Sequence, residues 1–266
     1  MGFGRYVEVG RMDDLARLDS PVHRLDARTK VLTTVAFIVA VMSFPRYEVS
    51  ALMPFFLFPL VLMNIAGIPS GLILRKLMLA APFALVVGVF NPLLERQIVM
   101  TAGVFDISGG WLSFASIILR FILTVSAALV LVACTGIHRL GAGLIRLGMP
   151  RVFAVQIQLL HRYLFVMTDD AVRMVRAFEM RSVGPSTPRF GVYASMTGHL
   201  LLRSLERAQG IYEAMVSRGY DGTVRVMSPT AIRFADVLFF AGWLIFFIAA
   251  RTWNLSLLLG GLITGL

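Results

Sequence analysis

The stretch WLSFASIILRFILTVSAALVLVACT, residues 111–135, decides the fold of this chain because it contains a single charged residue, Arg120. A helix needs about 20 mostly apolar residues to cross the hydrocarbon core of a bilayer. This stretch is long enough and therefore predicts a membrane-spanning helix. The whole chain agrees, since 58% of its 266 residues are hydrophobic, 15% are charged and the mean hydropathy is +0.79. These values indicate an integral membrane protein and exclude a soluble globular domain.

Other apolar stretches lie along the chain, of which the first and the last are short for a span. The complete set of predicted spans is 29–45, 49–66, 76–94, 111–135 and 234–250. The apolar tail at 254–266 is shorter, so whether it forms a sixth span stays open. The longest outer loop is expected at 95–110, which carries several charged residues and two adjacent glycines. The predicted fold is all-α and polytopic, with about five transmembrane helices.

Basic residues indicate the orientation of these spans. Arg24, Arg28 and Lys30 precede the first span, and a long run of arginines follows the fourth. Because cytoplasmic loops are enriched in Lys and Arg, the N-terminus and region 136–233 are expected in the cytoplasm. The protein is therefore expected to lie in the cytoplasmic (inner) membrane with its N-terminus inside the cell.

The chain divides into three predicted regions. Residues 1–135 form an N-terminal tail and four spans, residues 136–233 a cytoplasmic region, and residues 234–266 a C-terminal transmembrane segment. The formal charge of +10 suits anionic lipid headgroups, because the arginines lie beside apolar spans. No nucleic-acid-binding motif accompanies this charge, so nucleic acid is not an expected partner.

Region 136–233 has the pattern of two long amphipathic helices. Apolar residues recur at intervals of three and four from Leu160 to Phe178, and again from Leu201 to Met215, while charged residues take other faces. The stretch Gly184-Pro185-Ser186-Thr187-Pro188 separates the two helices. A shorter helix is expected at 137–148, where a glycine and a proline end it.

Each long helix ends in a short motif that contains one arginine. The motifs are Met180-Arg181-Ser182 and Ser217-Arg218-Gly219. In one interpretation, each arginine only stabilises the last carbonyl groups of its helix. In the other, its planar fork of donors binds a carboxylate or carbonyl group of another protein. We favour docking, because the motif recurs at both helix ends with a small residue after each arginine.

Arg120, within the fourth predicted span, leaves two interpretations open. An arginine at this depth is costly, so a structural arginine is expected to pair, to snorkel or to face the bundle interior. Alternatively, Arg120 lines the path of a transported substrate, although no intramembrane acid accompanies it.

No residue set in the sequence points to catalysis or to a resident cofactor. The four histidines lack the spacing of metal ligands, and the one cysteine, Cys134, lies in an apolar run. No G-x-x-x-x-G-K-[ST] loop for ATP is present. We therefore expect a non-enzymatic chain without a metal site, and any ATP used would be bound by partner subunits.

Three stretches carry a family resemblance: SPVHRLDARTK at 20–30, QIQLLHRYLF at 156–165 and YEAMVSRGYDG at 212–222. In order and spacing the chain resembles the transmembrane T component of energy-coupling factor (ECF) transporters, the EcfT/CbiQ family, and is most similar to its cobalt branch, CbiQ. The resemblance implies a complex with two cytoplasmic ATP-binding cassette (ABC) ATPase subunits and a substrate-binding S component. A small accessory membrane subunit is a further implied partner.

The resemblance also implies roles for the two arginine motifs. In this family each motif docks into a groove of one ATPase, which assigns coupling to Met180, Arg181, Ser182, Ser217, Arg218 and Gly219. The family usually has alanine before the arginine, so Met180 and Ser217 depart from its pattern.

These observations favour a non-catalytic coupling subunit of an ATP-driven importer. Cobalt is the favoured substrate, and nickel or a vitamin are alternatives. The rival hypothesis is a stand-alone channel or secondary transporter that uses Arg120. A membrane enzyme has the least support.

Overall fold

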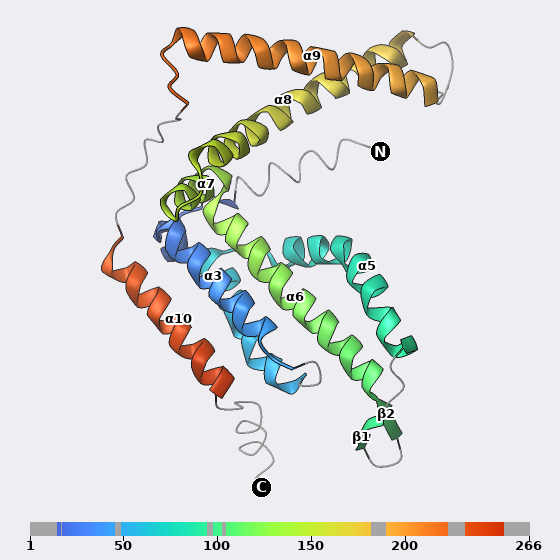
Figure 1. Cartoon of the computed structure of the whole chain (residues 1–266), viewed down its shortest axis with the longest axis vertical. Helices are drawn as coiled ribbons and strands as arrows, with labels where there is room; N and C mark the ends of the chain where they lie inside the picture. Colours follow the sequence, from blue (N-terminus) through green and yellow to red (C-terminus); the bar gives the residue numbers. More distant parts are fainter. Residues whose placement is uncertain are drawn as a thin grey trace. The chain divides into compact units, whose positions relative to one another are not determined.

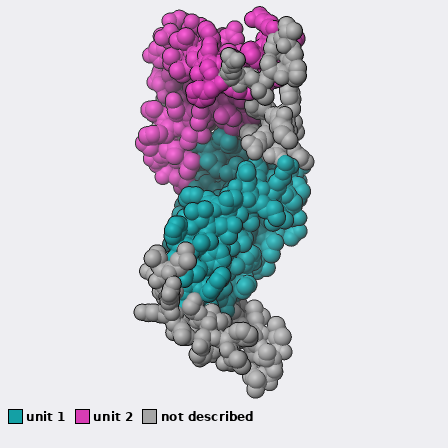
Figure 2. All heavy atoms as spheres, turned by 90° about the vertical axis from the view of Figure 1, so that its right-hand side faces the viewer, with its two compact units in different colours: residues 1–143, 229–266 teal, residues 144–228 magenta. Residues whose placement is uncertain are grey.

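A computed structural model of the chain describes residues 15–16, 18–45, 49–94, 98–102, 105–181, 190–222 and 232–252. The chain divides into two compact units, residues 1–143 with 229–266 and residues 144–228 (Figure 2). The helices of the first unit are α2 (Pro21–Arg24), α3 (Ala27–Met42), η1 (Ser50–Phe56), α4 (Leu57–Ala66), α5 (Ser70–Leu94), α6 (Gly109–Thr135) and α10 (Phe234–Thr252). α7 (Ile137–Arg146) spans the division, and α8 (Arg151–Arg181) and α9 (Phe190–Ser217) form the second unit.

The predicted helical fold is confirmed for the described residues, with one exception. The stretch 95–110 was expected to be a loop, but it contains the antiparallel strands β1 (Ile98–Ala102) and β2 (Phe105–Ser108). The register pairs Ile98 with Ser108 and Ala102 with Phe105. β-Branched and aromatic residues are frequent in both strands, and such residues favour extended backbone.

The expectation of about five transmembrane helices is confirmed only in part. Among the described residues, three helices are long and apolar enough to cross a membrane: Ser70–Phe90 within α5, all of α6 and all of α10. α3 has only 16 residues, about 24 Å of helix against a core of about 30 Å. Pro45 disfavours helical backbone at the residue before it, which explains why α3 ends before residue 45.

The second predicted span, 49–66, agrees with the structure to within one residue at its start, but it counts among the shorter apolar helices. It forms the apolar helix Ser50–Ala66, whose first part is the 3₁₀ helix η1 with Pro54 inside it. The predicted tail at 254–266 lies outside the described residues.

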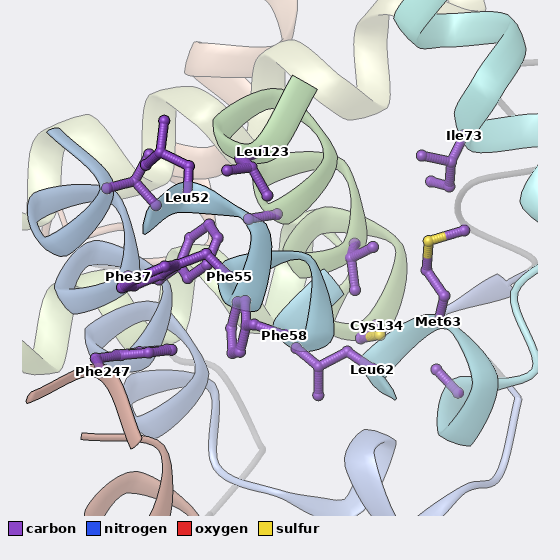
Figure 3. Close-up of a cluster of buried hydrophobic side chains, with 14 of the residues drawn as sticks. Phe37, Leu52, Phe55, Phe58, Leu62, Met63, Ile73, Leu123, Cys134 and Phe247 are labelled. Carbon is purple, nitrogen blue, oxygen red and sulfur yellow. The ribbon is translucent and has the colours of Figure 1, made fainter. Parts of the chain in front are cut away.

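Aromatic side chains hold the first unit together where α3, η1, α4 and α10 meet (Figure 3). The ring of Phe37 stacks on that of Phe58 with centroids 4.6 Å apart, and Phe247 lies 5.5 Å from Phe37. Phe55 and Trp243 extend the same cluster. These are the offset and edge-on arrangements that aromatic pairs prefer. The cluster fixes the C-terminal helix α10 against α3, although about 200 residues separate them in sequence.

Two buried carboxylates join the start of α3 to the start of α10. Asp26 caps α3, since its Oδ1 accepts a hydrogen bond from the backbone N–H of Arg28 at 2.9 Å. Asp236 accepts two backbone N–H bonds at 2.7 Å, one from Asp26 and one from Arg233. Its side chain therefore satisfies a donor before each helix, and we call this contact the Asp26–Asp236 clasp.

The residues just before α3 are anchored by a second set of polar contacts. His23 is buried, and its Nε2 donates to the carbonyl of Leu15 at 3.0 Å while Nδ1 accepts from the Ser20 hydroxyl at 2.7 Å. Arg139 of α7 donates to the carbonyls of His23 and Ala16. The ammonium group of Lys30 donates to the carbonyl of Cys134 at 3.1 Å. These bonds hold the residues before α3 against α7 and the C-terminal end of α6.

The second unit consists mainly of two long helices. α8 starts nine residues before the predicted stripe at Leu160, and α9 extends beyond the predicted 201–215 at both ends. The short helix expected at 137–148 is confirmed as α7. The predicted separator 184–188 lies outside the described residues. α8 and α9 cross, and their C-terminal ends lie on opposite sides of the crossing (Figure 1).

Replacing Asp236 with alanine is expected to destabilise the first unit. The change leaves the buried N–H of Asp26 and the partly buried N–H of Arg233 without acceptors, and a buried group of this kind costs about 1–3 kcal/mol. Unfolding in detergent micelles should therefore show a loss of about 2 kcal/mol or more. The matched control is Asp19→Ala, which removes an exposed ion pair with Arg24 and should cost less than about 1 kcal/mol. Equal effects of the two changes would contradict the clasp.

The stability of the protein should fall as the pH drops below about 6.5 because of His23. Burial lowers the pKa of His23 below its ordinary value of 6.5, and the charge of Lys30 acts in the same direction. The unfolded imidazole therefore binds a proton at a pH where the folded one does not, which favours unfolding. Thermal melts at about pH 7.5 and 5.5 should show a smaller pH effect in His23→Gln than in the wild type. The exposed control His199→Gln should behave like the wild type.

Candidate functional site

The C-terminal end of α8 presents the first arginine motif. Arg181 is the last residue of the helix and is exposed, and Met180 before it is 81% exposed. The third residue of the motif, Ser182, lies outside the described residues. A methionine at this exposure offers a flexible apolar surface beside the guanidinium group.

The C-terminal end of α9 is a Schellman motif, which explains the sequence Ser217-Arg218-Gly219. The N–H of Gly219 bonds to the carbonyl of Val216 at 2.9 Å, and the N–H of Tyr220 bonds to that of Met215 at 3.0 Å. Gly219 has φ of +80°, a left-handed conformation that glycine adopts without steric cost. The hydroxyl group of Ser217 bonds to the carbonyl of Glu213 at 2.8 Å. The helix therefore stops directly after Arg218, whose side chain is exposed.

The two arginines occupy nearly equivalent positions. Arg181 is the last helical residue of α8, and Arg218 is the first residue after α9, so their places differ by one residue. Neither side chain forms a hydrogen bond or ion pair with the residues that the structure describes. Both guanidinium groups thus present their donors on the surface at the negative end of a helix dipole.

Arg120 has backbone partners within the protein. Its Nη2 donates to the carbonyls of Phe44 and Pro45 at 3.0 and 2.8 Å. Arg251 of α10 reaches the same segment, with hydrogen bonds to Ser43 and its guanidinium carbon 4.6 Å from the centre of the Phe44 ring. Both arginines therefore supply donors where Pro45 has ended α3. These contacts favour the structural interpretation of Arg120 over a substrate path.

A polar contact that the sequence did not reveal joins α8 to α9. The carboxylate of Asp170 accepts from Arg173 of its own helix at 3.1 Å and from Arg207 of α9 at 2.7 Å. The adjacent residue Asp169 is exposed, so the two aspartates have different roles. Charged residues of an amphipathic helix usually face solvent. Asp170 differs from Asp169 only because α9 crosses α8 beside it.

The described residues do not assemble a metal site or a catalytic set. No three His, Cys, Asp or Glu side chains within them converge in a way that would hold a metal ion. The ring nitrogens of His23 are both engaged in hydrogen bonds. The surface arginines at the two helix ends can bind a carboxylate or carbonyl group, but they offer no nucleophile or base.

Comparisons with known proteins give a family match and two relatives. The family pattern of CbiQ, described as cobalt transport protein, matches residues 19–230. An uncharacterized protein of Methanocaldococcus jannaschii is 23% identical over 237 residues, which cover 84% of this chain and 79% of the relative. The energy-coupling factor transporter transmembrane protein EcfT of Bacillus subtilis is 25% identical over 218 residues, 76% of this chain and 82% of the relative.

The match to the family pattern begins just before the anchored stretch 20–30 and ends beyond the Schellman motif of α9. It therefore includes both arginine-bearing helix ends. The chain belongs to the CbiQ/EcfT family and is a multi-pass membrane protein, the non-catalytic transmembrane T component of an energy-coupling factor transporter.

Proposed function

We propose that this chain couples two cytoplasmic ABC ATPase subunits to an S component, with Arg181 and Arg218 each docking on one ATPase. The observation that carries this proposal is the pair of exposed guanidinium groups at the C-terminal ends of two crossing helices. Because the ends lie on opposite sides of the crossing, one partner subunit can bind each without competing for the same surface (Figure 1). The orientation that places residues 144–228 in the cytoplasm follows from their arginine content.

The apolar surface of α8 and α9 supports a second partner. Large hydrophobic side chains are exposed along both helices, among them Leu160, Phe190, Leu201, Leu205 and Tyr212. A surface of this kind is stable only against lipid or another apolar protein. A membrane-embedded S component, with or without a small accessory membrane subunit, would cover this apolar surface. Movement of α8 and α9 would then be transmitted to the S component.

The proposed substrate is cobalt, and it rests on the description of the matching family. Substrate recognition is assigned to the S component, so this chain would serve import without touching the metal ion. ATP is likewise assigned to the partner ATPases. The channel hypothesis loses its main support, because Arg120 donates to backbone carbonyls.

The combined change Arg181→Ala and Arg218→Ala should abolish co-purification of the ATPases. Arginine hot spots at interfaces contribute about 2 kcal/mol or more each, so either single change should weaken binding roughly 30-fold. The measurement is the amount of ATPase recovered with the tagged, membrane-inserted chain. The matched control is Arg162→Ala with Arg203→Ala, which removes two exposed arginines of the same helices away from their ends. Full ATPase recovery with the first pair would overturn the docking proposal.

Proteoliposomes containing the complete complex should accumulate radioactive cobalt only when ATP is available to the ATPases. The double variant at Arg181 and Arg218 should show no uptake above liposomes without protein, because ATP hydrolysis is no longer coupled to the helices. Excess nickel should compete weakly if cobalt is the substrate. Uptake by this chain alone, without nucleotide, would instead support the stand-alone transporter.

A further inference from the structure

α9 is held to α8 with very little apolar burial. All residues of Phe190–Ser217 are described, and none of them is buried. The helix is long and therefore keeps its internal hydrogen bonds, but these do not determine its angle to α8. Some specific contact must define the crossing, because exposed apolar side chains slide over one another with little directional preference.

Asp170 provides such a contact. Its side chain is only 6% exposed, and its two carboxylate oxygens accept from arginines of different helices. The bond from Arg207 Nη2 to Oδ2 is 2.7 Å long, the short distance of a charge-assisted hydrogen bond. Arg173 donates a hydrogen bond to the other carboxylate oxygen, Oδ1, at 3.1 Å. The position of Arg207 on α9 is therefore fixed relative to Asp170 on α8.

The place of this pair along the helices links it to the arginine motifs. Arg181 lies eleven positions after Asp170, and Arg218 lies eleven positions after Arg207. At about 1.5 Å per residue, each arginine lies roughly 16 Å beyond the crossing contact. A rotation of about 20° at the contact would thus move a helix end by about 6 Å, enough to misplace a docking site.

We propose that Asp170 and Arg207 are positioning residues that set the crossing of α8 and α9 and thereby the distance between Arg181 and Arg218. This inference rests on the proposed function, because the two helix ends matter only if they dock on partners. The ion pair acts through geometry and does not itself touch an ATPase. Arg173 supports the carboxylate from the α8 side.

The distance between the helix ends can be measured by double electron–electron resonance on the full chain without its partners. Cys134, the one cysteine in the sequence, is replaced by alanine, and spin labels are attached at Met180→Cys and Val216→Cys. Both label positions are exposed. The parent should give one narrow distance distribution. Asp170→Asn and Arg207→Gln should each at least double its width or shift its maximum by about 5 Å or more.

Matched controls separate positioning from general damage. Asp169→Asn and Arg203→Gln change exposed neighbours on the same helices and should leave the distribution unchanged. Arg207→Lys keeps the positive charge and should restore part of the narrow distribution. The double variant Asp170→Asn with Arg207→Gln should be no broader than either single variant, since both remove the same contact.

An unchanged distribution in Asp170→Asn and Arg207→Gln would overturn the positioning role, as would equal broadening in the two exposed controls. If Asp170→Asn cannot be purified, Arg207→Gln gives the same test, because the side chain of Arg207 is one-third exposed and its replacement disturbs folding less. Failure of the proposed function looks different. In that case the labels report the expected change, but Arg181→Ala with Arg218→Ala still recovers the ATPases.

Discussion

Little hydrophobic burial holds α9 to α8 in the part of the chain that the structure describes, and the function of the two helices depends on this constraint. α9 has no buried residue, yet it is a long helix that ends in an ordered Schellman motif. Two such helices keep a defined crossing only through a specific polar contact or through partners that cover them. Asp170 and Arg207 supply the contact, and the exposed apolar side chains indicate the partners. A surface built in this way can move as a lever without breaking a packed core.

The first unit shows the opposite design. Phe37, Phe58 and Phe247 pack α3, α4 and α10 around one aromatic cluster. Asp236 then ties the beginnings of α3 and α10 together through backbone donors. Within the first unit, packing and hydrogen bonding therefore act together to hold α10 to α3.

Much of the helical architecture could be predicted from the sequence because the signals are local. A 25-residue apolar run with one charge identified α6, and stripes with intervals of three and four identified α8 and α9. Gly219 marked a helix end because a left-handed residue after a helix favours glycine. The prediction that Arg181 and Arg218 couple to ATPases stays a prediction.

The errors arose where the answer depends on tertiary contacts. One further difference is local: α3 ends at Met42, three residues before Pro45, whereas Pro54 lies inside η1 and does not end the helix Ser50–Ala66. The hairpin of β1 and β2 arose from residues that composition alone marked as a loop. Asp170 could not be told from Asp169, because its burial depends on where α9 crosses α8. Arg120 was ambiguous for the same reason, since its carbonyl partners lie about 75 residues earlier in the chain.

The central claim is that two separate helix ends each hold one motor subunit. A cryo-electron microscopy structure of the chain assembled with its ATPases and S component tests it most directly. The account predicts that the guanidinium groups of Arg181 and Arg218 contact two different ATPase subunits. A structure in which both side chains face lipid or bulk water, while the ATPases bind elsewhere on the chain, would contradict it.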